Sequence, residues 1–144
     1  MFRKISEVMT RDVEVLQPTD SVHDAAELMR SFNVGVVPVC EDGQVVGVLT
    51  DRDVVVRAVA LGMDAASTQV VDVMTAHVEV CHDDDDVGSV LERMKMQQLR
   101  RFIVVDERER LVGIVSLGDL SQDFSEQRVG EALEGISEPA PPAL

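Results

Sequence analysis

Hydrophobic and polar positions follow the same pattern twice along this chain, with a shift of about 65 residues between the two copies. Each copy begins with a short helical turn. It continues into a brief stretch of alternating polarity, which predicts a strand over 13–15 in the first copy and over 78–80 in the second. Further on, Val46-Gly47-Val48 aligns with Val112-Gly113-Ile114 once one residue is inserted in the second copy's turn. The chain is therefore a tandem duplication.

Within each copy the pattern predicts the order strand–helix–strand–strand–helix. The first long helix follows the capping residue Ser21, and apolar residues at helical spacing predict one buried face: Val22, Ala25, Ala26, Met29 and Phe32. Two strands follow, over 36–39 and 45–49 in the first copy and over 102–105 and 111–115 in the second. A final helix is expected from near Asp51 to about Leu61, where Gly62 ends it, and from near Leu117 through 120–124 in the second copy.

A single copy of about 60 residues buries little surface and would be only marginally stable by itself. We therefore expect an α/β (α+β) fold in which the two copies pack their small sheets face to face around a pseudo-two-fold axis. The expected boundaries are 3–63 for repeat 1, 64–69 for a linker and 70–125 for repeat 2. Residues 126–144 form a C-terminal extension, and its proline-containing end is expected to be disordered.

Composition narrows the function. Hydrophobic residues make up 45% of the chain and aromatic residues only 3%, so the core must be aliphatic. The net charge of −14 argues against nucleic acid or an anionic membrane as a partner, because both select for a basic surface. No apolar run approaches the roughly 20 residues needed to span a bilayer. No signal peptide is recognisable, and two cysteines are too few for a disulfide scaffold, so a cytoplasmic protein is expected.

The same motif stands at the end of the strand expected over 45–49 and at the end of the strand expected over 111–115. It reads Gly47-Val48-Leu49-Thr50-Asp51-Arg52-Asp53 in the first copy and Gly113-Ile114-Val115-Ser116-Leu117-Gly118-Asp119 in the second. A hydroxyl and a carboxylate three residues apart, where a strand meets a helix, suit a ribose-phosphate: the hydroxyl contacts the phosphate and the carboxylate accepts from ribose hydroxyls. Helix capping is the alternative, because Thr, Ser and Asp are the residues that cap. The two roles are compatible.

The duplicated motif and the order of elements resemble the CBS domain, named after cystathionine β-synthase, two of which in tandem form a Bateman module. The resemblance covers roughly residues 3–125. It implies a regulatory module that binds AMP, ADP or ATP in clefts between the two repeats. Some members bind S-adenosylmethionine, NAD or metal ions, and two modules often stack into a flat dimer. The stretch 49–57, with Ala60-Leu61-Gly62 after it, is similar to stand-alone bacterial CBS-pair proteins of the hypoxic-response type.

The resemblance assigns roles to particular residues. Thr50 with Asp53, and Ser116 with Asp119, match the phosphate and ribose positions, and Arg100-Arg101 match a basic pair that grips phosphate. A solvated helix end is the alternative for the arginines. In the first repeat Gly35 and Val36 stand where that pair would be, so the two clefts are expected to be inequivalent. The resemblance also implies that a basic pair can serve the phosphate in the cleft that carries the other repeat's Asp, so the two clefts are not ranked.

The family pattern also implies apolar walls for an adenine. These are Thr10, Val13 and Val37 in one cleft region and Thr75, Val78 and Phe102 in the other. Core packing is the alternative for each, and for the valines it is the favoured one.

No residues assemble a catalytic constellation, so we expect no enzyme and no required cofactor. His82 followed by Asp83–Asp86 fits a solvated loop and helix cap better than a metal site, because consecutive residues do not converge easily on one ion. Two hypotheses remain: a sensor of an adenine nucleotide or adenosyl ligand, and an interaction or stress-response protein with vestigial or metal-binding clefts. An unidentified protein target is expected, as is a homodimer through the final helices, where Val54, Val55, Val56, Ala58, Val59 and Leu61 are more apolar than one buried face needs.

Overall fold

The computed structural model describes residues 3–121, residue 130 and residues 133–136, and the chain divides into two compact units. Unit one combines the described residues up to Val13 with Glu79–Arg108 and the described residues from Val112 onward, and unit two combines Glu14–Val78 with Glu109–Leu111. The segment that precedes each repeat thus packs with the other repeat. Thr10 forms an antiparallel bridge with Ile114, and Thr75 forms the matching bridge with Val48. The compact units therefore cut across the contiguous repeats of the sequence.

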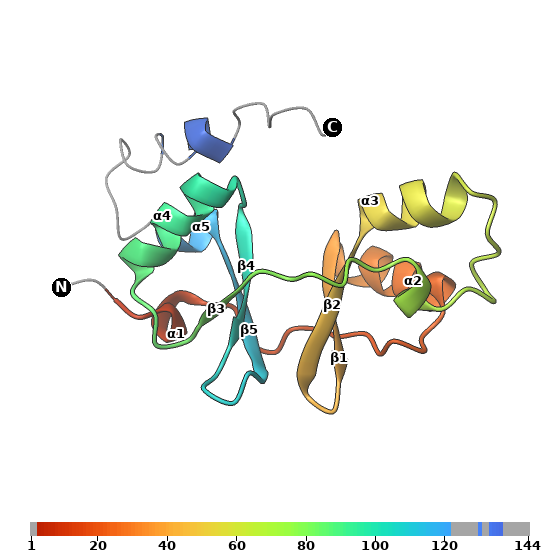
Figure 1. Cartoon of the computed structure of the whole chain (residues 1–144), viewed down its shortest axis with the longest axis horizontal. Helices are drawn as coiled ribbons and strands as arrows, with labels where there is room; N and C mark the ends of the chain where they lie inside the picture. The colour runs from red at the N-terminus through yellow and green to blue at the C-terminus, as the bar shows by residue number, and fades with distance from the viewer. Residues whose placement is uncertain (1–2, 122–129, 131–132, 137–144) are drawn as a thin grey trace. The chain divides into compact units, whose positions relative to one another are not determined.

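Unit two is built on a two-stranded hairpin (Figure 1). Strand β1 (Val36–Glu41) pairs antiparallel with β2 (Gln44–Thr50), and the register shifts between Val39 and Cys40. The two-residue turn between them, Asp42-Gly43, has φ of 54° and 80°, the left-handed pair of values that a tight hairpin turn requires. Helix α2 (Val22–Phe32) precedes the hairpin. Helix α3 (Asp51–Asp53), the π-helix η1 (Val54–Val59) and the 3₁₀ turn η2 (Val70–Asp72) follow it.

Helix α2 forms where the sequence predicts it. The Ser21 side chain accepts a hydrogen bond from the Asp24 N–H, and Asn33, in the left-handed region, ends the helix. Its buried face is narrower than predicted. Val22, Ala25 and Met29 are buried, whereas Ala26 is exposed and the Phe32 side chain is 55% exposed. Successive residues are rotated by about 100° around a helix, so Ala26 points away from the side on which Ala25 is buried. Phe32 is the last residue of the helix, after the last buried residue, Met29.

Unit one holds a three-stranded sheet in the order β3-β4-β5, formed by β3 (Val80–His82), β4 (Arg101–Val105) and β5 (Leu111–Ser116). Strand β3 runs parallel to β4. Helices α1 (Ile5–Val8), α4 (Val87–Gln97) and α5 (Leu117–Leu120) belong to the same unit (Figure 1). Among the described residues this core is aliphatic apart from the Phe102 ring, as the composition indicated; it includes Ile5, Val90, Leu91, Met94, Phe102, Val104, Val115 and Leu120. The α/β fold class with two small sheets is confirmed.

The predicted first strands are displaced. Residues 13–15 form no strand, and the pairing occurs one residue later, where Leu16 makes a parallel bridge with Val39. Its N–H donates to the Pro38 carbonyl and its carbonyl accepts from the Cys40 N–H. The predicted strand over 78–80 begins only at Val80 and continues to His82. Alternating polarity identified the two segments, but the neighbouring strand determines which residues pair with it.

The final helix of the first repeat starts at Asp51, as predicted, but widens after one α turn into the π-helix η1. The Ala60 N–H donates to the Val55 carbonyl, five residues back. Val54–Val56 are three consecutive β-branched residues, which crowd a normal α turn. Gly62, with φ of 72°, ends the segment as predicted. In the second repeat α5 is described to Leu120, and the predicted continuation to Phe124 and most of the 126–144 extension lie outside the described residues.

None of the helices in the described part of the chain is long and apolar enough to cross a bilayer.

Candidate functional site

The two predicted hydroxyl–carboxylate pairs both form closed capping boxes where a strand meets a helix. The Thr50 N–H donates to Asp53 Oδ2 at 3.0 Å, and the Asp53 N–H donates to Thr50 Oγ1 at 3.0 Å. The Ser116 and Asp119 pair repeats this arrangement at 2.8 and 3.2 Å. Helix capping is therefore a real role of these residues. Because each box uses the hydroxyl oxygen as an acceptor, the hydroxyl proton is still available to a ligand.

In unit two the Asp53 carboxylate is engaged further. Its side chain is almost fully buried, with 8% of the residue exposed. The Thr75 hydroxyl lies 3.4 Å from both carboxylate oxygens. The Arg57 Nε lies 3.9 Å from Asp53 Oδ1, and the same guanidinium donates to the Met74 carbonyl at 3.1 Å. The contact of Thr75 with Asp53 was not expected from the sequence, and neither was the role of Arg57. Asp53 and Arg57 nevertheless have the spacing of four residues that places side chains on one helix face.

In unit one the Asp119 carboxylate has fewer polar contacts than the Asp53 carboxylate has in unit two. Asp119 is half-buried, and its Oδ2 accepts from the Ser116 N–H. Among the residues that the structure describes, no side chain donates to its second oxygen. A carboxylate with one free oxygen beside a hydroxyl suits a ligand that offers hydroxyl groups, such as a ribose.

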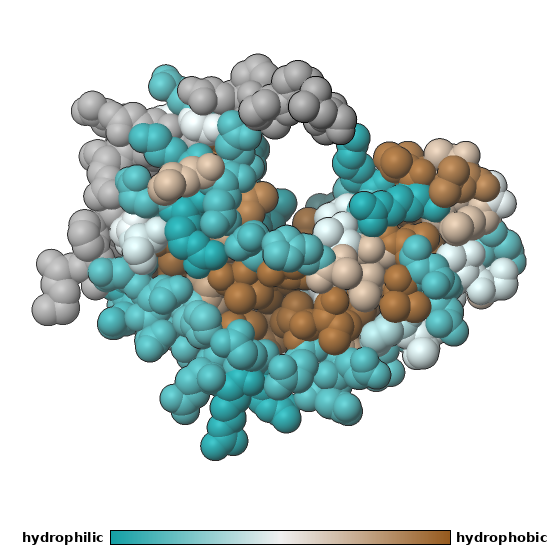
Figure 2. Space-filling view, viewed as in Figure 1, coloured by the Kyte–Doolittle hydropathy of each residue, from teal (hydrophilic) through white to brown (hydrophobic). Residues whose placement is uncertain are grey.

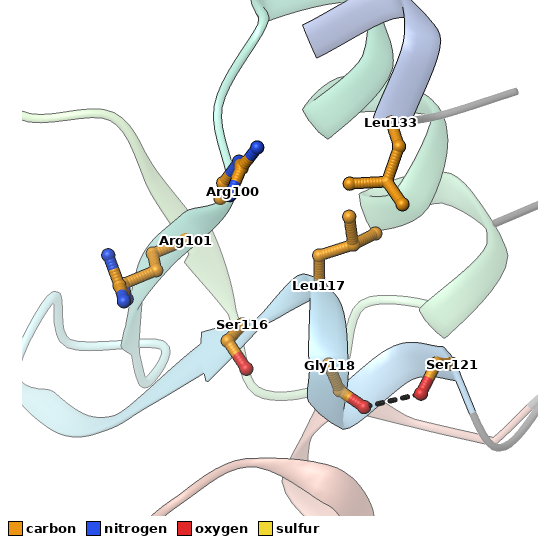
Figure 3. A pocket seen from close by; sticks show the side chains of 7 residues that line it. All are labelled: Arg100, Arg101, Ser116, Leu117, Gly118, Ser121 and Leu133. Atoms are coloured by element: carbon orange, nitrogen blue, oxygen red, sulfur yellow. Dashed lines mark hydrogen bonds between the residues drawn. The ribbon is translucent and has the colours of Figure 1, made fainter. Parts of the chain in front are cut away.

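A cavity of about 360 Å³ opens beside this second capping box. It is lined by Arg100, Arg101, Ser116, Leu117, Gly118, Ser121 and Leu133 (Figure 3). The Leu117 N–H donates to the Arg100 carbonyl at 2.8 Å, which fixes the start of α5 against the residue that precedes β4. Ser121 Oγ donates to the Gly118 carbonyl at 2.7 Å, while the Leu117 and Leu133 side chains face each other (Figure 3). The cavity thus has a basic side and an apolar side.

Both arginines of the predicted basic pair line this cavity, and both are exposed. Within the described residues neither guanidinium forms an ion pair or a hydrogen bond with another side chain. Two adjacent uncompensated cations in a chain of net charge −14 concentrate positive potential at one place. The cavity can therefore attract an anion, and a guanidinium can bind a phosphate with two parallel hydrogen bonds.

The residues expected to form apolar walls for an adenine were placed in two groups of three, and each group contains residues from both compact units. Thr10 lies in unit one, where its backbone exchanges hydrogen bonds of 2.8 and 3.0 Å with Ile114, and half-buried Val13 lies in the same unit. Thr75 and half-buried Val78 lie in unit two. Within one compact unit the structure brings Thr10 together with Phe102, not with Val37, and Thr75 with Val37, not with Phe102.

Val37 and Phe102 are core residues. Each is 1% exposed and belongs to the hydrophobic core of its unit. The Arg93 guanidinium lies 4.6 Å from the centre of the Phe102 ring and covers it. Their burial favours the core alternative over the role of an adenine wall.

The cysteines and the acidic loop are structural. Burial raises the pKa of the Cys81 thiol to about 12 and also raises the pKa of Cys40, so both thiols are protonated at neutral pH. The His82 N–H donates to Asp85 Oδ2 at 2.9 Å, so this loop carboxylate closes its own turn. Among the residues described, no three His, Cys, Asp or Glu side chains gather in a way that could hold a metal ion.

Comparison with known proteins identifies the family. The model of the CBS domain family matches residues 5–59 and 70–126. The Bacillus subtilis protein YlbB is 42% identical over 138 residues, which cover 94% of this chain and 92% of YlbB. Hypoxic response protein 1 of Mycobacterium tuberculosis is 28% identical over 134 residues, 92% of this chain and 93% of that protein.

Solved structures show the same fold. A CBS domain protein of Thermoplasma acidophilum matches with a TM-score of 0.78 at 27% identity, over 94% of this chain and 76% of the other. CBSX2 in complex with AMP matches with a TM-score of 0.72 at 28% identity, over 83% and 94%. The CBS domain pair of protein MJ0100, in complex with 5′-methylthioadenosine and S-adenosyl-L-methionine, matches with a TM-score of 0.72 at 25% identity, over 85% of this chain and 100% of the other.

Proposed function

The chain belongs to the CBS domain family, and from that premise we propose that it is a regulatory module that binds an adenine nucleotide or another adenosyl ligand and performs no chemistry on it. The observation that carries the proposal is the cavity in unit one, where the capping box of Ser116 and Asp119 meets Arg100 and Arg101. One wall of that cavity offers the Ser116 hydroxyl, whose capping partner Asp119 supplies a carboxylate for the ribose, and another wall offers two guanidinium groups for a phosphate.

The relatives support the ligand class. CBSX2 is known in complex with AMP, and the MJ0100 pair in complex with 5′-methylthioadenosine and S-adenosyl-L-methionine. All three ligands contain adenosine, while their 5′ substituents differ in charge. The groups at the capping box, which suit the ribose, are common to both repeats of this chain, whereas the groups that suit a phosphate are not.

A bound nucleotide can regulate the protein only if it binds one arrangement of the chain more tightly than another. A nucleotide in the unit one cavity contacts the start of β4 and the start of α5 together, so it stabilises whichever arrangement of the chain holds them at this separation. The extent of any shift is limited by the ratio of its affinities for the two arrangements. A partner protein that recognises one arrangement then senses the nucleotide.

The proposal is tested by isothermal titration calorimetry of the purified chain with AMP, ADP, ATP and S-adenosylmethionine. The informative variant is Asp119→Asn, because an amide oxygen still accepts from the Ser116 N–H and preserves the cap while the negative charge is lost. We expect a roughly tenfold or greater loss of affinity for the best ligand, the effect of removing about one charge-assisted hydrogen bond. Asp84→Asn, in an exposed loop, is the matched control and should bind like wild type. If no adenosyl ligand binds to the wild-type chain, the proposal is wrong.

A second copy of the chain is the proposed partner of the hydrophobic η1 surface, which we define as Val55, Val56, Val59, Leu61 and Met63. These side chains are 57%, 48%, 67%, 70% and 41% exposed. Figure 2 shows the apolar patch that lies over the π-helix and the turn after it. Exposed apolar patches of this kind mark association sites, and a homodimer would bury both copies of the surface at once.

A further inference from the structure

The helical turn formed by residues 133–136, which we call the C-terminal turn, packs against unit one (Figure 1). Ile136 is half-buried against the hydrophobic core of that unit. Gly135 lies so close to the last turn of α4 that a Cβ atom there would lie 2.8 Å from Lys95 Cγ and 3.3 Å from the Lys95 carbonyl oxygen. The C-terminal turn is therefore held on α4 by one apolar anchor and by a close backbone approach that glycine permits.

The segment that follows the first repeat takes a different course. It packs at the start of α2, where the Val22 N–H donates to the Thr68 carbonyl at 2.9 Å. The His23 N–H likewise donates to the Ala65 carbonyl at 3.0 Å. The C-terminal turn packs at the opposite end of the corresponding helix, since Lys95 lies in the last turn of α4. Its placement is therefore particular to the second repeat and does not follow from the duplication.

Leu133 projects from the C-terminal turn toward the unit one cavity. It lines that cavity, and its side chain faces Leu117 (Figure 3). Leu117 is only 7% exposed, because it belongs to the core, whereas Leu133 is 37% exposed. The accessible part of the apolar side of the cavity is thus supplied mainly by one leucine that stays partly uncovered.

The other walls of the cavity leave this side for the base of a nucleotide. Arg100 and Arg101 suit the phosphate, and the capping box of Ser116 suits the ribose. A purine base is flat and largely apolar, and small-molecule sites hold such groups against apolar side chains. Contact between the base and the uncovered side of Leu133 removes apolar surface of both from water, which favours binding.

We propose that Leu133 contacts the base of the bound nucleotide and makes the C-terminal turn part of the ligand site. This inference rests on the proposed function. A nucleotide bound in this way contacts the C-terminal turn as well as the starts of β4 and α5. The coupling is reciprocal: a change that detaches the turn from α4 weakens nucleotide binding, and nucleotide binding strengthens the docking of the turn. The position of the C-terminal turn on α4 then depends on whether the cavity is occupied.

Calorimetric titration with AMP tests the contact itself. Leu133→Ala should weaken AMP binding about fivefold or more, because most of the apolar contact with the base is lost. Leu133→Met restores an apolar side chain of similar volume and should bind AMP within about twofold of wild type. Glu134→Gln is the matched control: residue 134 is exposed on the same turn and does not line the cavity, so its variant should bind like wild type.

A pair of glycine variants tests the docking of the turn without altering the cavity. Gly135→Val should weaken AMP binding at least as much as Leu133→Ala does, because its side chain would meet Lys95 and push the turn off α4. Gly130→Val is the matched control, since no described atom lies within 4 Å of a Cβ atom at that position. It should bind AMP like wild type.

Hydrogen exchange measured by mass spectrometry distinguishes a contact with the base from a purely structural role of Leu133. AMP should slow amide exchange across 133–136 about threefold or more in the wild-type chain, and by less in Leu133→Ala. Unchanged AMP affinity in Leu133→Ala or Gly135→Val, or exchange in the turn that AMP does not slow, would each overturn the inference and leave the proposed function intact. The same holds if AMP fails to bind while another adenosyl ligand binds. If no adenosyl ligand binds, both are wrong.

Discussion

The Arg57 guanidinium reaches back from the π-helix to the buried Asp53 carboxylate, with 3.9 Å between Nε and Oδ1, and donates to the Met74 carbonyl at 3.1 Å. This side chain therefore links η1 to the segment that precedes the second repeat and to the capping box of the first. Among the residues that the structure describes, no arginine makes the matching contact with Asp119.

Arg57→Ala should lower the free energy of unfolding by about 1 kcal/mol, mainly through the lost hydrogen bond to a backbone carbonyl. The ion pair itself contributes less, because half of the arginine side chain is exposed and solvent screens it. Urea denaturation followed by circular dichroism measures the change. Arg52→Ala is the control, since that side chain is exposed on the same helix, and it should leave the midpoint unchanged. Equal midpoints for the two variants would show that the link contributes nothing.

Gly113→Ala should destabilise the fold by about 2 kcal/mol. A Cβ there would lie 2.6 Å from the Thr10 carbonyl oxygen, which belongs to backbone that is held by two hydrogen bonds to Ile114. Gly118→Ala is the matched control, because its nearest contact would be Ser116 Oγ at 3.6 Å, an ordinary distance, and alanine favours the helix. In thermal melts, Gly113→Ala should lower the melting temperature, whereas Gly118→Ala should leave it unchanged or raise it. A Gly113→Ala variant as stable as wild type would contradict the close pairing of Thr10 with β5.

Stability should fall at alkaline pH because of Cys81. Burial raises the pKa of this thiol to about 12 in the folded protein, whereas the thiol of the unfolded chain ionises near pH 8.5. A raised folded-state pKa means that the stabilisation is complete below about pH 8.5 and is lost as the pH rises toward 12. The chain has no tyrosine to titrate in that range. Chemical denaturation between pH 8 and 11 should show a smaller decline for Cys81→Ala than for wild type.

Val59→Glu should convert the proposed homodimer into a monomer, because it places a charge on the most exposed valine of the hydrophobic η1 surface. Multi-angle light scattering at micromolar concentration reads out the mass directly. Met96→Glu is the control: Met96 is 81% exposed on α4, outside that surface, and its variant should keep the wild-type mass. A wild-type chain that elutes as a monomer would rule out the homodimer.

Much of the fold follows from local pattern. The duplication, the helix after Ser21, the hairpin turn at Asp42-Gly43 and the stop at Gly62 all depend on residues close together in the chain. The same is true of the capping boxes, since Thr50 and Asp53, or Ser116 and Asp119, are three residues apart and meet within one helical turn. The narrower buried face of α2 and the displaced first strands were not predictable, because a neighbouring strand decides which residues are covered and paired.

The sequence by itself therefore determined the repeat, the order of its elements and the paired hydroxyl–carboxylate motif, because these depend on interactions within a few residues. Tertiary structure alone decided that Thr10 pairs with Ile114 and Thr75 with Val48, since these bridges join residues far apart in the chain and either repeat offers a similar strand edge. It also decided that the Asp51 carboxylate lies on Gly35 while Arg100 and Arg101 line an open cavity. This difference in local charge depends on which side chains the fold places next to each other. It distinguishes the motif of Thr50 and Asp53 from that of Ser116 and Asp119, although the two motifs are alike in sequence.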